Sequence, residues 1–199
     1  MRADALRTDD ETSLDQEKKD KVLRAALELF GRYGFKKTTM DEIAEAAGMS
    51  KRTVYEVFKG KENILAELVM SEALHFRKML IGRIKPLSDP VEKLELFCNL
   101  STDYFDKNPF LGQVLFDRED LYEPFLGGEI HTVEAGMRDI IANLLREGMR
   151  KGVFREMDIQ DNAQCVFVLY RGFTYQRGDV QNGSREWTCF ALRALMAER

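Results

Sequence analysis

Residues 38–61 read TTMDEIAEAAGMSKRTVYEVFKGK, and this stretch decides the fold of the N-terminal part of the chain. It holds two helix start signals, Thr39 and Ser50, eleven residues apart. Thr39 and Glu42 predict a capping box, in which the hydroxyl accepts from a backbone N–H and the carboxylate reaches back. Gly48 can adopt the left-handed conformation that closes a helix. Two short helices joined by a glycine turn make a helix-turn-helix.

The second helix of this motif is predicted to have one apolar and one polar face. Val54 and Phe58 lie four residues apart and share the apolar face. The polar face offers donors to base edges in its first turn and other groups that can reach phosphates. Its candidate DNA contacts are Ser50, Lys51, Arg52, Thr53, Tyr55 and Lys59. The motif alone is equally compatible with a solvated helix of an α-helical protein.

A longer pattern surrounds the motif, from Lys21 to Leu65. It comprises Ala25-Ala26, Leu29-Phe30, Gly34-Phe35, Thr38-Thr39, Ile43-Ala44, Ala47-Gly48, Ser50, Thr53, Tyr55, Phe58 and Lys61-Glu62. This pattern closely resembles the DNA-binding domain of the TetR family of transcriptional regulators. The resemblance implies a homodimer on a palindromic operator in double-stranded DNA. It adds Thr39 and Lys61 to the candidate DNA contacts and implies that Tyr55 and Lys61 contact phosphates.

Arg52 departs from the family pattern, which commonly has glycine between Ser-Lys and Thr. An arginine in the first turn of a recognition helix is suited to bidentate contact with guanine O6 and N7. We therefore expect Arg52 to contribute to base selectivity.

The composition is that of a globular chain of 199 residues, with 44% hydrophobic and 32% charged residues. Only four prolines and few alternating apolar segments predict an all-α fold of about nine helices. No apolar run reaches the roughly 20 residues of a membrane span, and residues 1–15 lack the apolar segment of a signal peptide. A cytoplasmic protein with no membrane partner is expected.

The formal charge of −4 is distributed unevenly. Residues 1–15 carry −3, residues 16–61 carry +4, and residues 62–199 carry −5. The basic block coincides with the helix-turn-helix, which predicts a DNA-binding head on an acidic body.

The chain shows no sign of catalytic or metal chemistry. Cys98, Cys165 and Cys189 form no Cys-x-x-Cys pair and are expected to be buried structural thiols, with a redox sensor as the alternative. His75 and His131 have no second ligand at helical spacing. We predict no catalytic residue, no metal site and no cofactor.

The predicted domains are a flexible tail (1–15), a helix-turn-helix head (16–62) and an effector-binding and dimerisation body (63–199). Ser13 with Gln16 is expected to open the first helix, Tyr33 to join its buried stripe, and Gly60 to close the third. A helix over 61–85 is predicted to link head and body. Pro124 and Gly127-Gly128 are expected to interrupt the chain before a helix over 129–151.

The body is assigned its roles chiefly by the family resemblance, which implies an effector cavity among the helices of 61–151. The effector is expected to be small and largely apolar. Polar candidates that could orient it are His75, Asn99, Tyr104, Gln113, Arg138 and Arg171, with Met79, Phe116, Met137 and Phe167 as apolar neighbours. Each of the polar residues could equally be a surface or structural residue.

The last two helices, 158–177 and 184–197, are more apolar than a one-sided core requires. The resemblance implies that they pair with a second copy as a four-helix bundle. Candidate dimer contacts are Phe167, Tyr170, Phe173, Trp187, Phe190 and Leu195.

The resemblance implies a transcriptional repressor that a small-molecule effector releases from its operator. Two other classes of function remain as alternatives. An architectural protein would coat DNA without base selectivity, but the basic block is short for that role. A helical enzyme with an incidental helix-turn-helix would need a catalytic motif, and none is visible.

Overall fold

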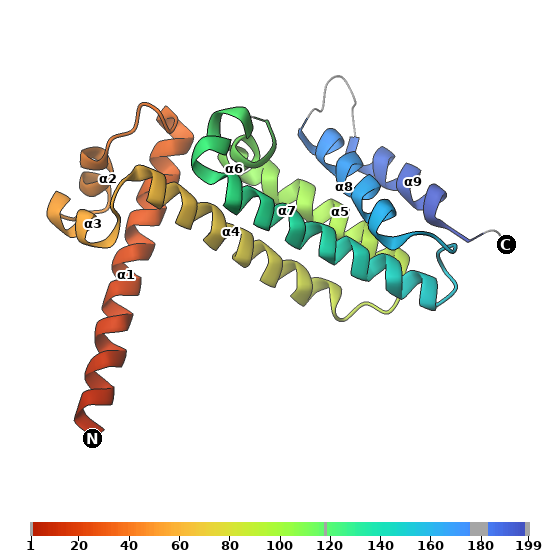
Figure 1. Cartoon of the computed structure of the whole chain (residues 1–199), viewed down its shortest axis with the longest axis horizontal. Helices are drawn as coiled ribbons and strands as arrows, with labels where there is room; N and C mark the ends of the chain where they lie inside the picture. The colour runs from red at the N-terminus through yellow and green to blue at the C-terminus, as the bar shows by residue number, and fades with distance from the viewer. Residues whose placement is uncertain (1, 118, 176–182, 198–199) are drawn as a thin grey trace. The chain divides into compact units, whose positions relative to one another are not determined.

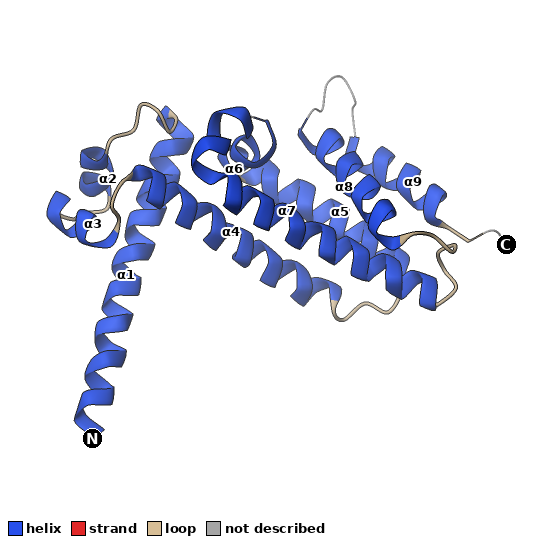
Figure 2. Cartoon of the chain, in the orientation of Figure 1, coloured by secondary structure: helices blue, strands red, loops and turns tan. Residues whose placement is uncertain are grey.

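The computed structural model describes residues 2–117, 119–175 and 183–197 (Figure 1). Within those ranges the chain folds into nine α-helices and one π-helical segment, which confirms the predicted all-α class (Figure 2). An isolated antiparallel bridge joins Phe154 and Met196. The chain divides into two compact units, Met1–Ser71 and Glu72–Arg199. Their boundary lies inside a helix, nine residues beyond the predicted one.

The first unit contains α1 (Arg2–Tyr33), α2 (Met40–Ala46), α3 (Lys51–Val57) and the first part of α4 (Lys61–Ile84). We call this unit the head. The helices α1, α2 and α3 pack against one another around an apolar core. Its buried members are Val22, Leu23, Ala25, Ala26, Phe30, Phe35, Ile43, Ala44, Val54, Phe58, Ile64, Leu65, Leu68 and Val69. The apolar face predicted for the second helix of the helix-turn-helix, with Val54 and Phe58, is therefore buried.

Two details of the head differ from the sequence prediction. Tyr33 is 50% exposed rather than buried, and the Arg32 guanidinium lies 5.1 Å from its ring centroid. The helix α3 ends at Val57, because the next residue, Phe58, has an extended backbone (φ −131°, ψ 128°), two residues before Gly60. Burial of the Phe58 side chain in the core, rather than a glycine, sets this helix end.

The first helix starts earlier than the Ser13–Gln16 signal predicts. It begins at Arg2, since residues 2–33 contain no proline and no glycine before Gly31 that would end a helix. The side chains of residues 2–13 lie outside the description. The flexibility expected of residues 1–15 stays a prediction.

The second unit, which we call the body, begins within α4 and includes all later helices. These are α5 (Pro90–Lys107), α6 (Pro109–Gly112), the π-helical η1 (Gln113–Asp117), α7 (Glu119–Arg150), α8 (Ile159–Tyr175) and α9 (Gly183–Leu195). The long α7 packs against both α5 and α8, and α9 packs against α5 and α8 (Figure 1). The largest fully buried side chains of this unit are Leu80, Leu94, Phe97, Leu111, Phe167, Tyr170 and Trp187.

The predicted interruption at Pro124 and Gly127-Gly128 does not occur, because α7 runs through all three residues. Pro124 lies in the second turn, where its missing N–H costs one helical hydrogen bond near the end of the helix. Packing of α7 against two neighbouring helices outweighs these local preferences.

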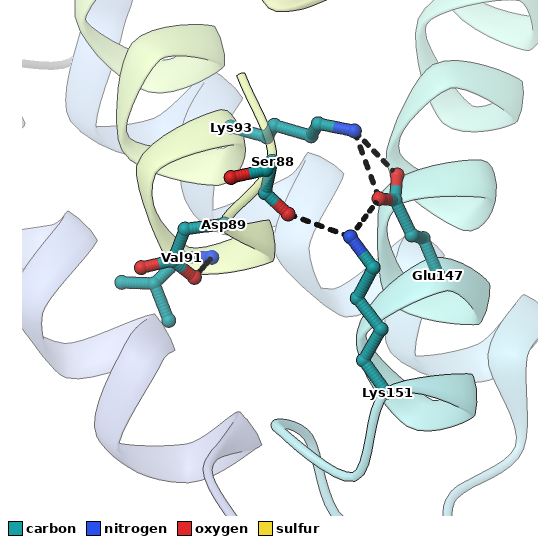
Figure 3. Close-up of polar contacts among 6 residues, drawn as sticks. All are labelled: Ser88, Asp89, Val91, Lys93, Glu147 and Lys151. Carbon is teal, nitrogen blue, oxygen red and sulfur yellow. Dashed lines mark hydrogen bonds and ion pairs between the residues drawn. The ribbon is translucent and has the colours of Figure 1, made fainter.

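A charged network joins the start of α5 to the end of α7 (Figure 3). Asp89 caps α5 by accepting from the Val91 N–H at 2.9 Å. Lys93 donates to both carboxylate oxygens of Glu147, at 2.8 and 2.7 Å. Lys151 donates to Glu147 Oε1 at 2.8 Å and to the Ser88 carbonyl at 2.6 Å. Hydrogen bonds from Lys151 and Lys93 lower the pKa of Glu147.

The end of α7 is closed by Gly152, whose φ of +67° favours glycine. The chain then folds back, and the Val153 and Phe154 N–H groups both donate to the Gly148 carbonyl, at 2.9 and 3.2 Å. The Phe154 ring is buried directly against Gly148, in the space that a β-carbon would occupy. Glycine at 148 is thus required by packing, not by its backbone angles.

Candidate nucleic-acid interface

The helix α2 begins with the predicted capping box. Thr39 Oγ1 accepts from the Glu42 N–H at 3.3 Å, and Glu42 Oε2 accepts from the Thr39 N–H at 2.8 Å. Hydrogen bonds from the Thr39 backbone N–H and hydroxyl lower the pKa of Glu42. The Thr39 hydroxyl also donates to this carboxylate at 2.9 Å. Thr39 is exposed, but its hydroxyl serves first as a cap.

The helix α3 presents the residues that the sequence assigned to DNA. Ser50 caps it by accepting from the Thr53 N–H at 3.1 Å, and the two hydroxyls lie 2.8 Å apart. Lys51, Arg52 and Lys59 are exposed, and Tyr55 is 45% exposed. Val54 and Phe58 hold the opposite face in the core. Burial of one face therefore aims a cationic first turn at solvent.

Two carboxylates that the sequence analysis overlooked pair with this cationic turn. Lys51 Nζ lies 2.6 Å from Asp41, and this hydrogen bond raises the Lys51 pKa. Arg52 Nε lies 3.0 Å from Glu56 Oε1, although the Arg52 side chain is 90% exposed. The four-residue spacing of Arg52 and Glu56 is a visible sequence signal for such a pair. Exposed pairs contribute under about 1 kcal/mol, so DNA can displace them.

Lys61 differs from the other candidates because its ammonium points into the head. It donates to three backbone carbonyls, those of Phe35 (2.9 Å), Lys36 (3.2 Å) and Thr38 (3.0 Å). It also lies 4.7 Å from the centroid of the Phe35 ring. All three donors of an ammonium are thereby engaged. This placement disagrees with the predicted phosphate contact.

Among the described residues, the effector candidates lie on several different helices of the body and differ in exposure. Three of them, His75, Asn99 and Gln113, are exposed. Each is next to a buried residue in the sequence but lies on the solvent side of its helix. Met79 is half-buried and Met137 is buried. The Phe116 side chain lies outside the described residues.

Three other candidates do meet, around a carboxylate that the sequence analysis missed. Glu134 is 7% exposed. Its oxygens lie 2.7 Å from Arg171 and 3.6 Å from Arg138. The Arg138 guanidinium also lies 5.3 Å from the Phe167 ring centroid. This cluster joins α7 to α8, and the four-residue spacing of Glu134 and Arg138 was its visible signal.

Tyr104 is placed separately, against α4. Its hydroxyl donates to Glu72 Oε2 at 2.6 Å, and its ring centroid lies 4.6 Å from that of Phe76. Burial, followed by the hydrogen bond to Glu72, raises the pKa of Tyr104. This contact connects α5 to the part of α4 that belongs to the body.

The dimer candidates are mostly interior to the protomer. Phe167, Tyr170, Trp187 and Leu195 are at most 3% exposed, so they fill the core of the body and leave no surface for a partner. Phe190 is 63% exposed, as a partner contact requires. The Phe173 side chain lies outside the described residues. Apolar spacing in the sequence predicts that a residue is buried. It does not say whether the residue is buried in the core of its own protomer or against a second copy.

The cysteine prediction is wrong for two of three residues. Cys98 is buried, and burial raises its pKa to about 12. Cys165 and Cys189 are exposed on α8 and α9. Among the described residues, no group of histidines, cysteines and carboxylates is arranged to hold a metal ion. None of the described helices combines the length and apolar content that crossing a membrane requires.

Comparison with known proteins identifies the head. Residues 22–68 match the family of bacterial regulatory proteins, tetR family. The fatty acid metabolism regulator protein of Bacillus subtilis is 28% identical over 149 residues, covering 73% of this chain and 76% of the relative. The transcriptional repressor KstR2 of Mycolicibacterium smegmatis is 27% identical over 158 residues, covering 75% and 74%.

The fold is shared with a solved regulator. The crystal structure of FadR from Bacillus subtilis, in complex with stearoyl-CoA, superposes with a TM-score of 0.73 at 22% identity. The superposition covers 88% of this chain and 98% of that one. Together with the capped helix-turn-helix and its exposed cationic turn, the match over residues 22–68 identifies the head as a DNA-binding domain of the TetR family of transcriptional regulators.

Proposed function

We propose that the protein is a homodimeric, cytoplasmic repressor that binds a palindromic operator and is released by a small, largely apolar effector. The observation that carries the proposal is α3, which buries Val54 and Phe58 and turns Lys51, Arg52 and Tyr55 toward solvent. Cationic and hydroxyl groups on one exposed helix face suit a major groove and its flanking phosphates.

The proposed dimer uses the outward faces of α8 and α9. Val168 is 54% exposed and Phe190 is 63% exposed, each on a helix whose other face is buried in the body. Large apolar side chains at these positions favour burial by a second copy. Two-fold pairing there presents two heads, as a palindromic operator requires.

The proposed effector carries a fatty acyl chain. The support is the name of the Bacillus subtilis relative, a fatty acid metabolism regulator, and the stearoyl-CoA bound by FadR. An acyl chain also matches the largely apolar effector that the sequence analysis expects. The positions of His75, Asn99 and Gln113 at the surface argue against these three as orienting groups, whereas Arg138 and Arg171 stay candidates.

The proposed coupling element is α4, which begins in the head and continues without a break into the body. Its head part buries Ile64, Leu65 and Leu68, and its body part packs Phe76 against Tyr104 and Phe105. An effector that shifts the body part would change how the heads engage two half-sites.

The first experiment selects binding duplexes from a random double-stranded library and measures the stoichiometry by sedimentation. The proposal expects a palindromic consensus bound by two protomers. Equal affinity for selected and random duplex, with a length-dependent number of bound copies, favours the architectural alternative instead.

The second experiment titrates acyl-CoAs of graded chain length into the free protein and into the operator complex. Linkage requires that a ligand which weakens operator binding by some factor binds the complex more weakly by that same factor, typically about 5–150-fold. Equal affinity in both titrations excludes release by that ligand. Free coenzyme A is the control for the acyl chain.

A further inference from the structure

Lys61 occupies a position that its solvent-exposed neighbours do not share. Its ammonium is surrounded by the carbonyls of Phe35, Lys36 and Thr38, at 2.9 to 3.2 Å. An ammonium has three donors and no acceptor, so the three carbonyls use its full hydrogen-bonding capacity. A phosphate contact would require at least one of these bonds to break.

The carbonyls belong to the turn between α1 and α2, which has no regular secondary structure of its own to hold it. Thr38 is 1% exposed, and its hydroxyl donates to the Gly34 carbonyl at 3.0 Å. Phe35 is buried edge-to-face on Phe30, with centroids 5.2 Å apart, and the Lys61 ammonium lies 4.7 Å from the Phe35 ring centroid. Lys61, the first residue of α4, is thus hydrogen-bonded to a turn that lies 23 to 26 residues earlier in the sequence.

The turn leads directly into the helix-turn-helix. Thr39 follows the last carbonyl bound by Lys61 and is the N-cap of α2. The position of α2 in turn supports α3, which packs against it. If the turn is loosened, fewer heads hold α3 in the position that binds DNA. The apparent affinity for DNA falls in proportion to the fraction of heads that remain competent to bind.

We propose that Lys61 is a positioning residue: its ammonium acts as a three-carbonyl latch that orders the 35–38 turn for DNA binding and makes no phosphate contact. The inference rests on DNA binding by the head. It assigns Lys61 a role that differs in kind from that of exposed lysines such as Lys59.

Replacing Lys61 by arginine distinguishes a phosphate contact from binding to the three carbonyls. A phosphate contact tolerates either cation. A planar guanidinium cannot direct donors at three carbonyls that converge on one nitrogen. The variants are Lys61→Met and Lys61→Arg, with Lys59→Gln as the matched control, and affinity for the selected duplex is measured at several salt concentrations. Circular dichroism confirms that each variant is folded at the temperature used.

The latch predicts that Lys61→Met and Lys61→Arg both weaken binding about tenfold, the equivalent of one lost charged hydrogen bond, with an unchanged salt slope. Lys59→Gln is expected to lower the slope by about 0.9. The proposal is overturned if Lys61→Met lowers the slope by that amount, if Lys61→Arg binds as tightly as the unaltered protein, or if Lys61→Met has no effect.

A readout without DNA separates this proposal from the proposed function. In ¹⁵N spectra of the free protein, the Lys61 ammonium should exchange slowly with water, and the carbonyl ¹³C shifts of residues 35, 36 and 38 should change in Lys61→Met. A rapidly exchanging Lys61 ammonium, like that of Lys59, refutes the latch even if DNA binding is normal. Failure of the unaltered protein to select any duplex refutes the proposed function and leaves this readout intact.

Discussion

Replacing Gly148 by alanine tests the closure of α7 in the body. The new β-carbon would coincide with the Phe154 ring, whose side chain is 2% exposed. The ring must leave its site, and exposing a buried phenylalanine costs about 1.5–3 kcal/mol. Alanine regains about 1 kcal/mol of helix propensity over glycine. Loss of the well-packed contacts around the ring adds to the cost. We therefore expect a net destabilisation of about 2 kcal/mol.

The assay is denaturant unfolding followed by circular dichroism, with all variants at one protein concentration because a dimer's stability depends on it. Gly128→Ala is the matched control in the same helix: apart from the adjacent helix backbone, no atom lies within 4 Å of its added β-carbon, so it should stabilise by up to about 1 kcal/mol. In a Phe154→Ala background the clash disappears, and Gly148→Ala should become neutral or stabilising. Destabilisation by Gly148→Ala that persists in that background would refute the packing argument.

Three further predictions concern recognition, pH and assembly. Arg52→Ala should cost about 1–3 kcal/mol of discrimination at one base pair per half-site, measured by competition between selected and single-mismatch duplexes, and equal losses on selected and random DNA would make Arg52 a phosphate contact. Glu147→Gln should destabilise the body by about 1.5–3 kcal/mol near neutral pH, because Lys93 and Lys151 bind the ionised carboxylate. The pKa of Glu147 in the folded protein lies below the ordinary 4.5. The difference in unfolding free energy between the unaltered protein and Glu147→Gln should therefore have its full size above pH 4.5 and vanish as the pH falls through the lowered pKa. A difference that stays constant down to acid unfolding contradicts the ion network. Phe190→Glu should convert the protein to a monomer in sedimentation at about micromolar concentration, whereas Glu186→Gln, an exposed change on the same helix, should not; a dimer that survives Phe190→Glu does not use this face.

The sequence by itself determined the helix-turn-helix, because its signals are local. Thr39 with Glu42, Ser50 and Gly48 act on backbone groups within a few residues, and each adopts its predicted role. The cap of α5 is equally local, because Asp89 accepts a hydrogen bond from the Val91 N–H two residues later. Apolar spacing likewise assigned Val54 to the buried side of α3. Such choices depend on neighbours along the chain and not on how helices pack.

Only the tertiary structure decided which of several physically equivalent roles a residue fills. Lys61 is a lysine beside a DNA-binding motif in the sequence, but three carbonyls from a distant turn surround its ammonium. Phe167 and Phe190 are alike in the sequence, yet one is buried and the other is 63% exposed. The helix α7 also continues past Pro124, because it packs against α5 and α8. The physical reason is common to all of these cases: burial and long-range hydrogen bonds depend on which elements meet, and composition and periodicity do not contain that information.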